Sequence, residues 1–345
     1  MPTAAGTFAF TATVTDAAKS TASASVSITI AASLTITTTS LPDAAAGVAY
    51  NQQLVATGNT GTVTWSLASG SLPQGISLNS AGVLSGSPTQ GGTFSFGVMA
   101  RDSAQSVVAT LSLTVKLQAI PQLSITGLPA TVPAAQQLTV GVSASAAYPV
   151  DLIGQLNLSV AADPAIGVTD PNVQFASGGT TISFRIPANS TQAVFTQPAA
   201  FQTGTVAGTI SLSVDSVQAG GVTQPGRAAL ASGVLNKSVP AIVGTPSVVR
   251  TSGGIQVTLS AYSTTREITG AVFTFQGASA PSAPISVPLS TLFSGWFASA
   301  ASLNFGSQFQ LVQPFGVTGS TSQVAGLTIT LTNSVGSSPA ISVNF

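Results

Sequence analysis

Residues 2–30 of the chain repeat the pattern of residues 88–115. At an offset of 86, Pro2, Thr3, Gly6, Thr7, Phe8, Phe10 and Asp16 correspond to Pro88, Thr89, Gly92, Thr93, Phe94, Phe96 and Asp102. The offset then becomes 85, so that Val26, Ile28 and Ile30 correspond to Leu111, Leu113 and Val115. One additional residue in the turn around Lys19 explains the change of offset.

This repetition, with apolar residues alternating with Ser and Thr, is typical of tandem β modules. Because the first copy holds only the end of the pattern, we expect Met1 to begin inside a module and the chain to be an internal piece of a longer protein. The same alternation continues at 138–142 and 327–331. We predict an all-β fold of tandem sandwiches, with half a repeat at 1–31 and complete sandwiches at 32–117, 118–239 and 240–345.

One segment departs from the β pattern. Between Leu289 and Ala300 the apolar residues follow the spacing of a helix with a single apolar face. We therefore expect one short helix at 289–300, lying across the last sandwich. Ser290 and Thr291 are the candidate capping residues at its start.

A second set of motifs lies within residues 47–103. The order GVAYNQQL at 47–54, VTWSLASGSLPQGISLNSAGVLSGSPT at 63–89 and TFSF with RDS at 93–103 resembles the immunoglobulin-like repeat domain of bacterial surface proteins, which is related to cadherin-like and dystroglycan-type modules. The resemblance covers residues 33–116 and, in part, 1–31. It implies a seven-stranded immunoglobulin-like β-sandwich that serves as a spacer or adhesive unit in large extracellular proteins, and it implies no chemistry.

Composition excludes several classes of function. Only 5% of the 345 residues are charged and the net charge is zero, so nucleic acid, which is bound chiefly through its phosphates, is not an expected partner. No apolar run approaches the roughly 18 to 20 residues of a spanning helix, so we expect no membrane insertion in this segment. The Thr-, Ser- and Gly-rich repeats are typical of exported bacterial proteins, which predicts an extracellular or cell-surface location.

The residue inventory argues against catalysis. The chain has no His, no Cys and one Glu, and its seven Asp residues are dispersed, whereas acid–base and nucleophilic catalysis need titratable groups held together. We predict that the chain is not an enzyme and has no cofactor. If calcium binds at all, the loop with Asp163, Asp170 and Asn172 is the expected place. Because calcium takes about six to eight oxygen ligands, we expect these Asp residues instead to bond their own turns.

Aromatic residues offer two interpretations. Trp65 occupies the position of a central core aromatic in a sandwich, and we expect it to be buried. Trp296, Phe297 and Gln308 could form a ligand-binding platform, although helix-spaced aromatics more simply cover the edge of a core. We expect the neighbouring charges Arg266 and Glu267 to be a solvated surface pair.

These observations predict a non-catalytic structural or adhesive segment of a large exported bacterial surface protein, as a spacer rod or a self-assembling filament subunit. The alternative is a carbohydrate- or protein-binding module centred on the C-terminal domain. Expected partners are other copies of the chain, other surface modules, or a glycan or host surface protein. The half repeat can fold back on the next module or self-associate through an apolar face, whose residues are Phe8, Phe10, Val26, Ile28 and Ile30.

Overall fold

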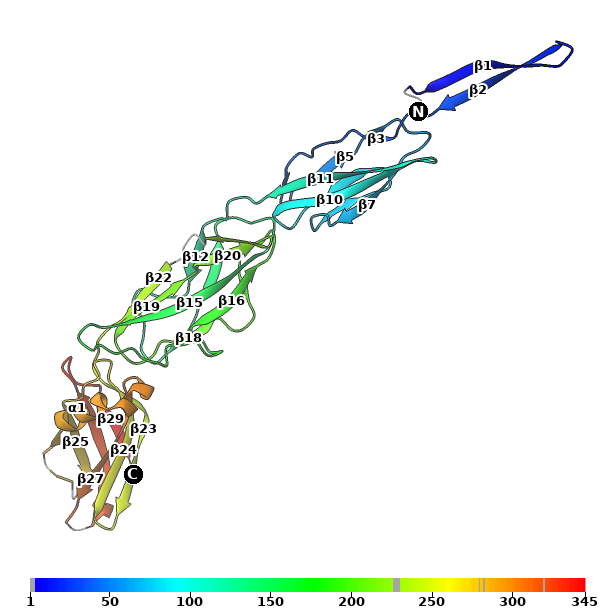
Figure 1. Cartoon of the computed structure of the whole chain (residues 1–345). Helices are drawn as coiled ribbons and strands as arrows, with labels where there is room; N and C mark the ends of the chain where they lie inside the picture. Colours follow the sequence, from blue (N-terminus) through cyan, green and yellow to red (C-terminus); the bar gives the residue numbers. More distant parts are fainter. Residues whose placement is uncertain (1–3, 226–229, 279, 282, 319, 345) are drawn as a thin grey trace. The chain divides into compact units, whose positions relative to one another are not determined.

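The computed structural model of the chain describes residues 4–225, 230–278, 280–281, 283–318 and 320–344. Several residues named in the predictions lie outside these ranges. They are Pro2 and Thr3 of the N-terminal repeat, Met1 at the start of the first predicted domain and Phe345 at the end of the last. The described residues are mostly β-strands, with one short α-helix and two 3-10 helices (Figure 1). The prediction of tandem all-β sandwiches with one short helix is therefore confirmed.

The chain forms two compact units. The first consists of Met1–Ile120, Ala147–Leu152 and Gln218–Gln224, and the second consists of Pro121–Ala146, Ile153–Val217 and Pro225–Phe345. Within them the strands form a hairpin and three sandwiches, which are named below by their strands. The division into four domains at 31, 117 and 239 stays a prediction.

The N-terminal element is a two-stranded antiparallel hairpin of β1 (Gly6–Thr15) and β2 (Thr21–Ile30). Apolar residues alternate with Thr and Ser along both strands, and cross-strand pairs such as Thr13 and Ser23 fix the register of the hairpin. Its loop, residues 16–20, is held by Asp16, whose Oδ1 accepts a hydrogen bond from the backbone N–H of Ser20 at 2.8 Å. Lys19 adopts a left-handed backbone with φ of 68°. Every side chain of the hairpin is exposed except that of Ile30, which is half-buried.

The β3–β11 sandwich places a four-stranded sheet, in the order β4-β11-β10-β7, opposite a three-stranded sheet, in the order β5-β9-β8. Alternation along β10 and β11 turns Phe96, Leu111 and Leu113 inward, where each is at most 2% exposed. The strands are β3 (Thr35–Ile36), β4 (Ala44–Ala45), β5 (Tyr50–Gln53), β6 (Ala56–Thr57), β7 (Thr64–Gly70), β8 (Ile76–Leu78), β9 (Val83–Gly86), β10 (Gly92–Arg101) and β11 (Ser106–Lys116).

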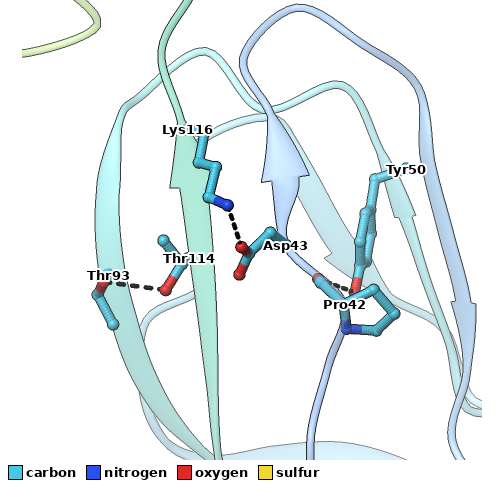
Figure 2. Close-up of polar contacts among 6 residues, drawn as sticks. All are labelled: Pro42, Asp43, Tyr50, Thr93, Thr114 and Lys116. Carbon is cyan, nitrogen blue, oxygen red and sulfur yellow. Dashed lines mark hydrogen bonds and ion pairs between the residues drawn. The ribbon is translucent and has the colours of Figure 1, made fainter.

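Trp65 on β7 is a core residue of this sandwich, as predicted, with 6% of its surface exposed. Gly82 makes room for it, because a Cβ atom at Gly82 would lie 2.6 Å from the indole Nε1. The outer surface carries polar pairs, among them the ion pair between Lys116 and Asp43 at 2.6 Å (Figure 2). Both of these charged side chains are exposed, so the pair contributes little to stability.

The β12–β22 sandwich is built around a seven-stranded sheet whose main path is β17-β16-β15-β19-β22. Phe175 and Phe201 meet edge to face in its core, with ring centroids 6.4 Å apart. The strands are β12 (Leu123–Thr126), β13 (Gln137–Thr139), β14 (Gly141–Ala144), β15 (Leu152–Ala162), β16 (Thr181–Ile186), β17 (Val194–Phe195), β18 (Ala200–Gln202), β19 (Gly208–Ser213), β20 (Ser216–Ala219), β21 (Val222–Pro225) and β22 (Leu230–Leu235).

The β23–β29 sandwich pairs a three-stranded sheet, β23-β24-β27, with a four-stranded sheet, β26-β25-β28-β29. Its core includes Phe273, Leu311, Ile329 and Phe293, the last contributed by the helix. Its elements are β23 (Ala241–Thr251), β24 (Gly254–Tyr262), β25 (Gly270–Gly277), β26 (Ile285–Pro288), α1 (Ser290–Ala298), η1 (Ala300–Phe305), β27 (Gln308–Gly316), η2 (Thr321–Gln323), β28 (Val324–Thr332) and β29 (Ile341–Asn344).

Helix α1 is present but differs in detail from the prediction. Its N-cap residue is Leu289, which makes no side-chain capping bond, so the proposal of Ser290 or Thr291 as cap is wrong. The Ser290 hydroxyl instead donates to the carbonyl of Thr269 on the neighbouring loop. The expected single apolar face is also incomplete, because Leu292 is 59% exposed.

Candidate functional site

An aromatic groove lies on the outer face of the β23-β24-β27 sheet. Val243, Ser260 and Gln310 stand side by side on the three strands, because Ser260 is the cross-strand partner of the other two. Trp296 from α1 and Phe305 from η1 stack beside this row, with ring centroids 6.3 Å apart and planes 30° apart. The groove has a volume of about 390 Å³, and its lining residues are Val243, Ser260, Ala261, Trp296, Phe305, Gln308, Phe309 and Gln310.

The indole N–H of Trp296, one of the residues that line the groove, makes no hydrogen bond to the described residues. Its Nε1 atom is buried and has no hydrogen-bond acceptor among the described residues. Leaving a buried donor unsatisfied costs about 1 to 3 kcal/mol.

The three residues predicted as a binding platform do not all meet in the groove. Trp296 and Gln308 line it. Trp296 and Phe297 both pack against the core, as the simpler interpretation expected, but Phe297 does not line the groove. Its ring centroid is 5.9 Å from that of Phe293 and 6.2 Å from that of Phe309. Phe305 and Gln310 occupy the place that the prediction gave to Phe297. That Trp296 and Gln308 bind a ligand stays a prediction.

The acidic loop singled out as the candidate calcium site spans residues 163–172, and its two carboxylates point to different partners. Asp163 Oδ1 accepts from the backbone N–H of Ala165 at 2.9 Å and forms an ion pair with Lys237 Nζ at 2.8 Å. The hydrogen bond from Lys237, followed by that from Ala165, holds the pKa of Asp163 below its usual value. The side chain of Asp163 is thus engaged by its own turn and by a lysine.

Asp170 is buried, with 4% of its surface exposed, and both of its carboxylate oxygens are used. Oδ1 accepts from the backbone and side-chain nitrogens of Asn172, each at 2.9 Å. Oδ2 accepts from the backbone N–H of Thr205 at 2.6 Å and from its hydroxyl at 2.9 Å. All four bonds come from protein donors, so the carboxylate of Asp170 is engaged by Asn172 and Thr205, while that of Asp163 is engaged by Ala165 and Lys237.

Arg266 is partly buried, and it is close enough to Asp170 for the carboxylate charge to affect its pKa. The expectation that Arg266 is a solvated surface residue is therefore wrong. Its guanidinium donates to the carbonyl oxygens of Gly306 and Phe297 and to the hydroxyl of Ser302. The same group lies 5.0 Å from the centroid of the Phe297 ring. Burial lowers the pKa of Arg266, while the charge of Asp170 acts in the opposite direction. The sequence contains no signal that brings Asp170 and Arg266 together, since they lie in different sandwiches.

Asp170 and Arg266 belong to a buried polar junction between the β12–β22 and β23–β29 sandwiches. The backbone N–H of Ser307 donates to the hydroxyl of Thr205 at 3.0 Å, and the hydroxyl of Ser307 donates to the carbonyl of Thr205 at 2.7 Å. Further bonds join Ala207 to Thr264 at 2.9 Å and Ser238 to Thr264 at 2.7 Å. Thr205, Ser307 and Thr264 are each at most 1% exposed. The two sandwiches therefore share a hydrogen-bonded interior.

The apolar residues of the β1–β2 hairpin form an exposed face. Phe8 and Phe10 are each 48% exposed, and Ile28 is 54% exposed. Val26 is 40% exposed, and Ile30 is half-buried. Among the described residues, β1 and β2 pair only with each other. Their role in self-association stays a prediction.

Within the residues that the structure describes, no group of three or more His, Cys, Asp or Glu side chains is placed to hold a metal ion. Over the same residues, no helix is both long enough and apolar enough to span a bilayer.

Comparison with known families identifies one of the sandwiches. Residues 32–116 match the family described as "Putative Ig domain". This segment is similar to that family. The match covers the β3–β11 sandwich, including Trp65 and the β10–β11 hairpin, and it agrees with the resemblance inferred from the motifs at 47–103. The search of curated protein sequences found no significant match.

Solved structures similar to the chain are extracellular domain arrays. The human desmocollin-1 ectodomain shares 12% identity at a TM-score of 0.27, over 98% of this chain and 64% of that chain, so the chain spans less than two thirds of it. Drosophila N-cadherin EC1-3 shares 14% identity at a TM-score of 0.25, over 83% of this chain and 88% of that chain. The N-terminal eight Ig domains of Down syndrome cell adhesion molecule share 12% identity at a TM-score of 0.23, over 98% and 39%. The fold assignment rests on the strand topology and on the family match.

Proposed function

We infer that the chain is a non-catalytic structural and adhesive segment of a large exported bacterial surface protein, in which its sandwiches act as a spacer. A spacer needs domains that hold one another in place without turnover or a cofactor. Ig-like sandwiches supply the domains, and the buried junction around Asp170 supplies a connection. This junction is the observation that carries the proposal.

The junction supports a spacer because the bonds that Ser307 makes to Thr205 join two residues that are each at most 1% exposed. A buried donor or acceptor that loses its partner costs about 1 to 3 kcal/mol, and more when the group is charged. Separating the two sandwiches would expose or orphan Asp170, Thr205 and Ser307 together. The connection therefore favours one arrangement of the two domains over a freely jointed one.

Single-molecule fluorescence energy transfer tests the proposal. The chain has no Cys, so Val194→Cys and Val312→Cys, at exposed positions on the two sandwiches, give two unique labelling sites. We expect a narrow distance distribution that neither calcium nor a chelator changes. Asp170→Ala should broaden it, and Asp43→Ala, which removes an exposed carboxylate of the β3–β11 sandwich, should leave it unchanged. A broad distribution in the unmodified junction would exclude a spacer role for these two sandwiches.

The second candidate function is binding of a carbohydrate by the groove of the β23–β29 sandwich. It is favoured by the stacked Trp296 and Phe305 rings, the adjacent Gln308 and Gln310 amides, and the unsatisfied indole N–H. Sugars present an apolar ring face for stacking and hydroxyl groups for hydrogen bonding, which are the two contacts that these residues offer.

A glycan array followed by titration of soluble oligosaccharides tests this second candidate. Trp296→Ala should abolish binding, and Trp296→Phe, which keeps an aromatic ring but removes the N–H, should weaken it. Val249→Ala is a matched control, because Val249 is an exposed residue of β23 that does not line the groove. Equal binding by Trp296→Ala and the parent chain, with the fold retained, would exclude the groove.

A further inference from the structure

The segment that runs from helix α1 into β27 contributes to both the aromatic groove and the polar junction. Phe305 and Gln308 line the groove. Between them in the sequence, Gly306 and Ser307 are buried, and Ser307 bonds to Thr205 of the neighbouring sandwich at 3.0 and 2.7 Å. Residues of the groove and of the junction therefore follow one another along the same short stretch of chain, so a shift of one set moves the other.

Arg266, in the loop between β24 and β25, holds this segment at two points. Its Nη2 atom donates to the carbonyl oxygen of Phe297 at 2.7 Å, and its Nη1 atom donates to that of Gly306. Phe297 follows Trp296 in the chain, and Gly306 follows Phe305. Since the stacked rings of Trp296 and Phe305 lie beside the sheet in the groove, one guanidinium fixes the backbone that carries both rings.

The backbone of Arg266 shows that this contact is maintained against a local cost. Arg266 has a φ of 53°, in the left-handed region that residues with a side chain rarely adopt. Such a conformation persists where the surroundings hold it, often at a functional site. Here the guanidinium bonds and the ring of Phe297, whose centroid lies 5.0 Å away, are the contacts that hold it.

Asp170 extends the same network into the β12–β22 sandwich. Its carboxylate lies against Gly306, where an added Cβ atom would be 2.2 Å from Oδ2, so only glycine fits. The same Oδ2 accepts from the hydroxyl of Thr205, which in turn accepts from the backbone N–H of Ser307. The negative charge of Asp170 also acts on Arg266. The position of residues 306–307 therefore depends on the neighbouring sandwich.

We propose that the β12–β22 sandwich positions the groove of the β23–β29 sandwich, with Asp170 and Arg266 as the positioning residues. Trp296 and Phe305 keep their stacked arrangement only while the junction is closed. The consequence for binding rests on the second candidate function, because it requires that the groove binds a ligand. A ligand that fits the stacked rings binds more tightly when the junction is closed, and by linkage it holds the two sandwiches together.

Fluorine-19 NMR of the full chain labelled with 5-fluorotryptophan tests the positioning without a ligand. The chain has two Trp residues, so two resonances are expected, and Trp296→Phe assigns them. Asp170→Asn and Arg266→Lys should each shift or broaden the resonance of Trp296, because Lys keeps the charge of Arg266 but lacks its planar fork of donors. The resonance of Trp65, in the β3–β11 sandwich, should stay unchanged.

The energy-transfer measurement between positions 194 and 312 reports on the junction in the same variants. Asp170→Asn should broaden the distance distribution and alter the Trp296 resonance together. Asn157→Ala is the matched control, because it removes an exposed side-chain bond to Asp215 from the sandwich that carries Asp170, and it should change neither. If Asp170→Asn does not fold, Ser307→Ala, which removes one bond to Thr205, replaces it.

Two outcomes would overturn the proposal. The first is a folded Asp170→Asn or Ser307→Ala chain whose distance distribution is broadened while its Trp296 resonance is unchanged, since the junction would then open without moving the groove. The second is an equal change of the Trp296 resonance in Asn157→Ala. Neither measurement uses a glycan, so a failure of the groove to bind carbohydrate would appear in the glycan array alone and is distinguished from a failure of the positioning.

Discussion

The β1–β2 and β10–β11 hairpins share a register and an outer hydroxyl pair, yet one is exposed and the other is the core of a domain. Local sequence is therefore sufficient to specify strand direction, pairing and turn. It does not specify burial, which depends on the segment that comes before the hairpin. An isolated two-stranded hairpin is marginally stable in water, so the comparison predicts that the two copies respond very differently to equivalent substitutions.

The largest expected effect comes from Trp65, which packs in the core of the β3–β11 sandwich. Trp65→Ala should destabilise the β3–β11 sandwich by about 3 to 5 kcal/mol, because it leaves a cavity in the core above Gly82. Hydrogen exchange should show faster opening of β10 and β11 and unchanged exchange in β1 and β2. Normal protection of β10 in this variant would mean that the opposite sheet does not stabilise the second hairpin.

The matched pair Phe96→Ala and Phe10→Ala tests the comparison directly. Phe96→Ala should cost about 3 to 5 kcal/mol, since its side chain is fully buried. Phe10→Ala, at the equivalent position, should change the urea midpoint of neither compact unit, because Phe10 is exposed. Similar losses from both substitutions would show that the first hairpin is covered in solution.

The two loops should differ in their response to acid. Hydrogen bonds from the backbone N–H groups of Thr60 and Ala104 hold the pKa of Asp102 below its usual value. A lowered pKa in the folded state contributes stability above the unfolded value of about 3.9, and this stability is lost as the pH falls through the folded value. Asp102→Asn should reduce this loss in an acid titration of the β3–β11 sandwich followed by circular dichroism. Asp16→Asn, in the other hairpin, should leave the titration of that sandwich unchanged.

The smallest expected effect concerns the outer faces, where the copies are alike. Thr114→Val and Thr29→Val each remove one hydroxyl from an exposed cross-strand pair, which contributes about 0.2 to 1 kcal/mol. Thr114→Val should shift the urea midpoint of its sandwich only slightly, and Thr29→Val should affect only hydrogen exchange within β1 and β2. A large loss from Thr114→Val would indicate that the outer face of β11 makes a contact that the β1–β2 face does not.

The sequence predicted the parts of the fold that depend on local pattern. Alternation gave the strands and the inward residues, and the change of offset near Lys19 corresponds to a loop of residues 16–20 in place of 102–105. The burial of Trp65 followed from its place in the family pattern. The spacing predicted the helix but not its cap, because Ser290 bonds to Thr269, which lies 21 residues earlier in the sequence.

Local sequence pattern did not predict the polar junction, nor the contribution of Phe305 and Gln310 to the groove. Asp170 and Arg266 carry no local sign that they face each other, since their contacts depend on how two sandwiches meet. Of the three residues proposed as a binding platform, Trp296 and Gln308 line the groove. Phe297 was misassigned, because the choice between the groove and the core depends on how the helix is rotated against the sheet.

The difference between the two hairpin loops has a practical consequence for handling the protein. The loop at 102–105 is fastened to the rest of its sandwich, since Ser103 donates to the carbonyl of Thr60 and Gln105 donates to that of Ala32. The loop at 16–20 bonds only within its own hairpin among the described residues. A peptide tag or a site for surface immobilisation inserted beside Lys19 should therefore leave the three sandwiches intact, whereas the same insertion beside Ser103 would break bonds that position the start of the Ig-like domain.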